Sequence, residues 1–109
     1  MDKEHLETTQ ALIKSYFEIE ETEQAFTEED LLRHLSNRIA YMIEYELELL
    51  LSTMYRLDVA EDKVQMSLSP LSTEAPNVAL AKIVLERQKQ RAHTKLTYKP
   101  EDLGPEWEF

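Results

Sequence analysis

The chain lacks cysteine altogether and contains a single glycine, Gly104, among its 109 residues. Without cysteine it forms no disulfide, and it has no thiolate for catalysis or zinc binding. One glycine is too few for the glycine-rich loops that bind dinucleotides or the phosphates of ATP. It also argues against a sheet protein, because hairpin turns and β-bulges commonly use glycine. The sequence therefore predicts an all-α fold.

Long apolar runs are missing as well, because the longest runs of strongly apolar side chains are only a few residues, as in Leu49–Leu51. The charged N-terminus, Met1 to Glu4, leads into no apolar segment of the length that a signal peptide or a membrane span requires. We therefore expect a soluble, cytoplasmic protein that does not enter a membrane.

What the chain does contain is helical periodicity over most of its length. The length suits one domain, and we predict a small bundle of three to four helices, with one long central helix, over residues 1–99. The first segment, roughly residues 3–21, is the least clear helix, since Tyr16–Ile19 fits a strand as well. Residues 100–109 hold two prolines, the glycine and four acids, which predicts an irregular acidic tail.

The central helix is predicted from a start signal and an apolar pattern. In Thr27-Glu28-Glu29-Asp30 the threonine can cap the amide of Asp30, and acids suit the first turn. The pattern that follows predicts one helix from Leu32 to Leu57. On a helical wheel its apolar residues cover roughly 200°, about twice the arc that a surface helix needs. We expect two packing neighbours for this helix, and a second subunit is a candidate for one of them.

Two further helices complete the predicted bundle. A second capping pattern, Asp58-Val59-Ala60-Glu61, predicts a short helix that ends near Leu68. A loop rich in turn-forming residues follows, and the last helix is predicted from Pro76 or Asn77 to about Lys95.

Charge is unevenly distributed along the chain, whose net charge is −10. Residues 1–30 hold ten carboxylates against Lys3 and Lys14, a sum of −8. Residues 82–99 hold six Lys and Arg against Glu86, a sum of +5. We expect these two segments to attract each other, within a chain or between chains, and we expect the chain as a whole to repel nucleic acid and anionic membranes.

The basic segment 87–99 has two interpretations. Arg87, Arg91 and Lys95 share one helix face and could contact phosphates, which would make the segment a weak nucleic-acid site. Aromatic residues for stacking on single-stranded bases are nearly absent from it. We favour the alternative, in which the segment complements the helix dipole and the acidic first segment.

Glu46 is the exceptional residue of the predicted central helix, because it lies among apolar neighbours on the wheel. A lone buried carboxylate is costly, so it should find a cation or stay near solvent. Arg87 and Arg91 continue the predicted apolar face of the last helix and are the natural partners. Glu46, Arg87 and Arg91 thus form a candidate polar cluster, either a small-ligand or enzymatic site or an ion pair that fixes helix register; we favour the ion pair.

The opposite face of the same helix mixes aromatic and charged side chains. Tyrosine and arginine are common at protein–protein contacts, so this stripe is a candidate interaction face, although it fits equally well as a solvated face or as the surface that receives the first helix. Its members are Arg38, Tyr41, Tyr45, Glu48 and Arg56.

Catalytic and metal-binding patterns find no support in the sequence. The serines have no histidine in a suggestive context and no glycine-rich elbow. The three histidines, His5, His34 and His93, form no Glu-x-x-His pair of the kind that a di-metal bundle uses. We therefore predict no catalytic residue, no metal and no cofactor.

Two stretches carry a resemblance, the run Leu50–Lys63 and the later run Ala81–Arg91. They resemble short uncharacterised bacterial helical proteins with an "LLYRIDV-EEK" element and a later "ERQ-QK" helix, over about residues 35–99. The resemblance implies a small helical cytoplasmic protein of bacterial type and says nothing about chemistry.

From the surplus apolar arc and the lack of reactive groupings, the sequence predicts a non-enzymatic protein–protein interaction module that acts as a homo-oligomer, most simply a homodimer. An unidentified protein partner, a ligand site at Glu46, Arg87 and Arg91, and weak nucleic-acid binding through residues 87–99 are the alternatives.

Overall fold

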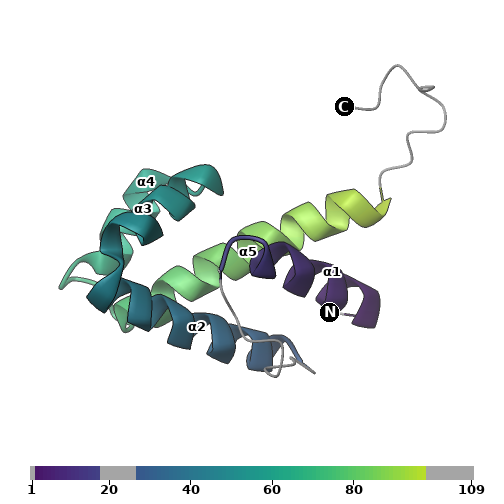
Figure 1. Cartoon of the computed structure of the whole chain (residues 1–109), viewed down its shortest axis with the longest axis horizontal. Coiled ribbons are helices and arrows are strands. Elements are labelled where there is room, and N and C mark those ends of the chain that lie inside the picture. The colour runs from purple at the N-terminus through teal and green to yellow at the C-terminus, as the bar shows by residue number, and fades with distance from the viewer. Residues whose placement is uncertain (1, 18–26, 98–109) are drawn as a thin grey trace, which may run out of the picture.

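The computed structural model describes residues 2–17 and 27–97, which form five helices and no strand. The helices are α1 (Lys3–Lys14), α2 (Glu28–Tyr45), α3 (Leu47–Arg56), α4 (Glu61–Leu68) and α5 (Pro76–Thr97). In Figure 1, α5 runs through the middle of the molecule, α1 and α2 lie along it, and α3 and α4 gather near the end where α5 begins. The all-α prediction is confirmed. Residues 18–26 and 98–109, which include the predicted acidic tail, lie outside the described residues.

Side-chain caps mark the first two helix starts. Asp2 accepts a hydrogen bond from the His5 amide at 2.8 Å and begins α1. The Thr27 hydroxyl accepts from the Asp30 amide at 3.0 Å, as the capping pattern predicts, and three acids fill the first turn of α2. Each cap satisfies an amide that has no partner within its own helix.

The Thr27 cap gives a simple stability prediction. Replacing Thr27 by alanine removes the acceptor for the Asp30 amide and is expected to lower the free energy of unfolding by about 1 kcal/mol. Serine at the same position keeps the hydroxyl and should restore most of the loss. Urea denaturation followed by circular dichroism measures both changes, and equal stability of the alanine and serine variants would contradict this role.

The predicted single helix from Leu32 to Leu57 is wrong, because the chain breaks at Glu46. Glu46 has φ −139° and ψ 46°, ending α2 and starting α3. In an unbroken helix Met42, Glu46 and Leu50 would follow one another at four-residue intervals on one face. Met42 and Leu50 are both fully buried, so a straight helix would carry the Glu46 carboxylate into the core. The break avoids that cost of burying a charge.

A left-handed residue ends α3. Asp58 has φ 59°, a conformation that aspartate tolerates better than most residues. Its position after the last turn of α3 overturns the predicted helix start at Asp58, because the N-cap of α4 is Ala60 and carries no side-chain hydrogen bond. The end of α4 at Leu68 agrees with the prediction.

The long central helix of the bundle is α5, which packs against α1, α2 and α4. It begins at Pro76, where a missing amide costs nothing, and its 22 residues extend two beyond the predicted end. The residues that it buries are Leu80, Ala81, Val84, Leu85, Gln88 and Ala92. They meet buried side chains of the other helices in one apolar core, among them Ile13, Leu35, Ile39 and Met54.

Candidate interaction surface

Large apolar side chains are exposed mainly around the α2–α3 junction. Within the described residues, six of the eight exposed large hydrophobic side chains lie between positions 41 and 55. We call these six the elbow surface: Tyr41, Tyr45, Leu47, Leu49, Leu51 and Tyr55. Two leucines of the predicted helix Leu32–Leu57, Leu49 and Leu51, are 47% and 41% exposed. The chain thus leaves uncovered a part of the apolar surface that its sequence concentrates here.

The elbow surface has internal order. Tyr41 and Tyr45 are one turn apart on α2, with ring centroids 4.9 Å from each other. On α3, Leu47, Leu51 and Tyr55 follow at four-residue intervals, which places them on one face of the helix. Five of the six exposed side chains therefore form a tyrosine pair on one side of the break and an apolar stripe on the other, while Leu49 lies on a different face of α3.

The predicted interaction face is divided by the break at Glu46. On α2 it is continuous, since the Arg38 guanidinium lies 5.3 Å from the centre of the Tyr41 ring, which in turn contacts Tyr45. Glu48 is exposed. Arg56 is directed elsewhere, with its guanidinium 5.4 Å from the ring of Tyr16. The predicted stripe of five residues is thus reduced to its α2 half plus Glu48.

The predicted cluster of Glu46, Arg87 and Arg91 does not form. A Glu46 carboxylate oxygen lies 3.1 Å from a guanidinium nitrogen of Arg38, eight positions earlier, and this ion pair spans the break. The Arg38 side chain is 17% exposed and that of Glu46 is 36% exposed. The expected ion pair therefore exists with a different cation, one supplied by the helix that Glu46 terminates.

The two arginines have their own partners within the described residues. Arg87 donates from Nε to the backbone oxygen of Leu57 at 3.3 Å and lies 3.7 Å from an Asp58 carboxylate oxygen. Arg91 donates to the Tyr16 hydroxyl at 3.3 Å and to Oε1 of Gln88 at 3.4 Å. The prediction failed because the buried face of α5 continues through Gln88 and Ala92, which leaves both arginines at its edge.

Most of the basic residues of α5 form ion pairs or hydrogen bonds with other parts of the same chain. The Lys89 amine lies 2.7 Å from a Glu28 carboxylate oxygen, and this hydrogen bond, chiefly, raises the pKa of Lys89 above its usual value. The pair joins the acidic first segment to the basic late segment within one chain, as the charge pattern predicts. A shallow depression lined by Arg87, Gln90, Arg91, Thr94 and Lys95 remains on the outer side of α5. Because its arginines already hold other groups, phosphate binding along residues 87–97 gains no support.

Tyr16 lies between two cations that sequence reasoning did not connect to it. Its hydroxyl accepts from Arg91, and the guanidinium groups of Arg91 and Arg56 lie 5.7 and 5.4 Å from its ring centre. The hydrogen bond from Arg91, followed by the nearby positive charges, holds the pKa of Tyr16 below its usual value. This contact ties the end of the first segment to α3 and α5, and its partners lie 40 and 75 positions away, beyond the reach of a local pattern.

Gln88 is a fully buried amide in the core of α5. Its Nε2 has no hydrogen-bond partner among the described residues, and its Oε1 has only the long contact from Arg91. Replacing Gln88 by methionine, which is similar in shape, is expected to raise the free energy of unfolding by about 1 kcal/mol, because an unsatisfied buried donor costs about 1–3 kcal/mol. Glutamate at this position should lower it by burying a charge. Urea midpoints of the two variants check the prediction, and a methionine variant less stable than the parent would contradict it.

No described helix combines the length and the apolar composition needed to cross a membrane. Comparison of the chain with protein-family models, with curated proteins and with solved structures found no match. The resemblance of residues 35–99 to short bacterial proteins therefore stays a prediction.

Proposed function

We propose that the protein is a non-enzymatic interaction module that forms a homodimer through the elbow surface. The observation that carries this proposal is the exposure of large side chains there, which reaches 66% for Tyr45 and 86% for Tyr55. Clustered apolar side chains on a soluble protein mark sites of association. Covering them with a second apolar surface releases the water that they order.

The chemistry of the elbow surface suits a protein partner. Aromatic residues are enriched at the centre of protein interfaces, and charged residues are depleted there. The contact between Tyr41 and Tyr45, with Arg38 over the Tyr41 ring, restrains these side chains before any partner arrives. Restrained side chains lose less conformational entropy on binding, which favours association.

The distribution of charge favours a second copy of this chain as the occupant. Two copies that each carry −10 repel each other, and the repulsion is weakest where the contact region is nearly neutral. Residues 38–57 hold Arg38 and Arg56 against Glu44, Glu46 and Glu48, a sum of 2 − 3 = −1. The Arg38–Glu46 pair neutralises part of even this. The region that holds six of the eight exposed large hydrophobic side chains is therefore also one where like copies can approach at low electrostatic cost.

Sedimentation equilibrium of the untagged chain across the micromolar range tests the proposal. We expect a mass approaching twice the 12.8 kDa of the chain as concentration rises. Added salt should tighten the dimer, because it screens the repulsion between two acidic chains and leaves apolar contact intact. A single 12.8 kDa species at every concentration would contradict the proposal, and a dimer that dissociates in salt would point to ion pairs instead.

We place this association in the cytoplasm, as the sequence predicts, since a chain without cysteine does not need an oxidising compartment to fold. The ligand site predicted at Glu46, Arg87 and Arg91 is not part of the proposal, because these side chains contact other residues. Retention on heparin at low salt would revive the nucleic-acid alternative for residues 87–99; we expect the chain to flow through.

A further inference from the structure

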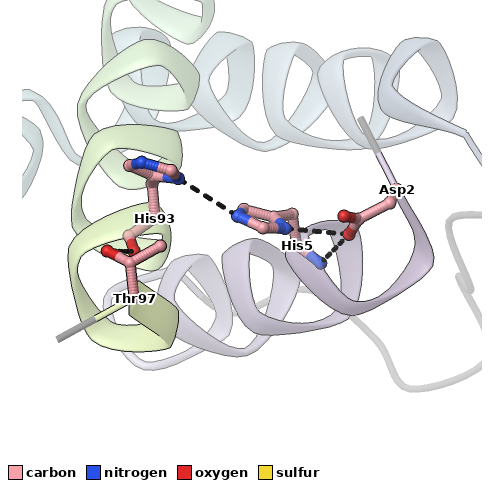
Figure 2. Close-up of polar contacts among 4 residues, drawn as sticks. All are labelled: Asp2, His5, His93 and Thr97. Carbon is pink, nitrogen blue, oxygen red and sulfur yellow. Dashed lines mark hydrogen bonds and ion pairs between the residues drawn. The ribbon is translucent and has the colours of Figure 1, made fainter. Parts of the chain in front are cut away.

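Two histidines 88 positions apart meet where α1 packs against α5. Nε2 of His5 lies 3.3 Å from Nδ1 of His93, and the two rings are stacked with centroids 5.5 Å apart. His5 is in the first turn of α1, and His93 is near the end of α5. Figure 2 shows the His5 ring between Asp2 on one side and His93 on the other. The meeting of two imidazole nitrogens from distant elements is not explained by the interaction surface.

The other nitrogen of His5 is held by a carboxylate. An Asp2 oxygen lies 2.8 Å from Nδ1 of His5 and also accepts from the His5 amide. A carboxylate only accepts hydrogen bonds, so Nδ1 of His5 carries a proton, and in the neutral imidazole Nε2 then presents its lone pair toward His93. A metal-bound histidine commonly donates a hydrogen bond from its other ring nitrogen to a carboxylate, which fixes the orientation of the ring.

The separation of the two facing nitrogens matches a metal site. Ligand nitrogens about 2.0–2.1 Å from a tetrahedral zinc ion lie about 3.3–3.4 Å from each other. The observed 3.3 Å therefore allows both nitrogens to reach one ion once the rings rotate so that their lone pairs converge on it. His93 must then carry its proton on Nε2, which is a change of tautomer without loss of a proton.

We propose that His5 and His93 bind one imidazole-preferring divalent transition metal ion, typified by Zn²⁺, and that the ion clips α1 to α5. Within residues 2–17 and 27–97 no group of three or more His, Cys, Asp or Glu side chains is arranged to hold a metal. Water therefore completes the coordination, and it has access because the His5 side chain is 27% exposed and His93 is exposed. The prediction of no metal from sequence considered spacing along single helices, and this pair joins two.

Calorimetric titration of the untagged protein with Zn²⁺ tests the site. The titration is run at mildly alkaline pH, because a histidine binds a metal ion through its neutral imidazole. We expect one ion per chain and binding at least about tenfold weaker in either His5→Gln or His93→Gln, since each leaves a single imidazole. The variant with both substitutions should bind Zn²⁺ almost as tightly as either single variant. Asp2→Asn keeps a helix-capping oxygen and should weaken binding by about tenfold.

The matched control is His34→Gln, which removes the remaining histidine and should bind Zn²⁺ as the parent does. Loss of binding in that variant, loss in only one of the two site variants, or no binding at millimolar Zn²⁺ would each overturn the proposal. A Zn²⁺-dependent doubling of mass that is lost in His5→Gln and His93→Gln would also overturn it, because the ion would then bridge two copies of the chain.

Long-range ¹H–¹⁵N spectra of the parent protein identify the zinc-bound ring nitrogens directly and need no variant. We expect Nε2 of His5 and Nδ1 of His93.

Discussion

Glutamate at both Leu51 and Tyr55 is expected to convert the proposed dimer into a monomer without disturbing the fold. The two side chains are 41% and 86% exposed and lie one turn apart on α3, so their replacement removes nothing from the core. In a dimer the new carboxylates would be desolvated against apolar surface, which is strongly unfavourable. They also take the net charge of each chain from −10 to −12. Sedimentation equilibrium should show a single 12.8 kDa species, with an unchanged circular dichroism spectrum.

A matched control separates the location of the charge from the charge itself. Met66 and Leu71 are 56% and 80% exposed and lie outside the elbow surface, at α4 and the loop after it. Glutamate at both positions adds the same two charges and should leave the dimer nearly as tight as in the parent. If the two double variants dissociate equally, association does not depend on the elbow surface and the proposed interface is wrong.

Replacing Leu80 by alanine is expected to lower the free energy of unfolding by about 2–5 kcal/mol. Leu80 is fully buried on α5, the helix against which α1, α2 and α4 pack, so neighbouring helices cannot readily close the cavity. A loss of that size is a large part of the stability of a small domain, about 5–15 kcal/mol. Urea denaturation at one fixed protein concentration measures the change, because a dimer's stability depends on concentration.

The control for this core substitution is Leu71→Ala, which trims a leucine that is 80% exposed. It should change the free energy of unfolding by no more than about 0.5 kcal/mol. A loss at Leu80 as small as the loss at Leu71 would show that α5 is not the centre of the core.

Local patterns in the sequence were enough to predict two of the helix starts. The Thr27 cap and Pro76 are signals contained within a few residues, and both mark helix starts in the structure. The all-α class followed from the scarcity of glycine and the helical periodicity. The position of Asp58 shows the limit of such signals, because its type fits both a helix start and the left-handed residue that it became.

The break in the predicted long helix had a signal in the sequence. Met42, Glu46 and Leu50 follow one another at four-residue intervals, so a straight helix required a carboxylate in its buried stripe. Periodicity alone does not reveal which way that conflict is resolved. A cation from a neighbouring helix could have neutralised Glu46, whereas in the structure the backbone turns and Arg38 of the same helix pairs with it.

The contacts between distant helices could not be predicted. Arg91 reaches Tyr16 and His5 meets His93 because α1 packs against α5, and the sequence carries no pattern that sets the rotation of one helix against another. The error over Arg87 and Arg91 has the same origin. A small rotation of α5 exchanges Arg91 for Gln88 and Ala92 at the buried face.

The place of α5 along the chain bears on how the molecule is made. It is the last of the described helices, yet α1, α2 and α4 all pack against it. During translation the earlier helices emerge before the surface that buries their apolar sides exists. Ribosome-bound nascent chains that stop short of residue 76 should therefore remain sensitive to protease. The chain should fold into a protease-resistant form only once α5 has left the exit tunnel.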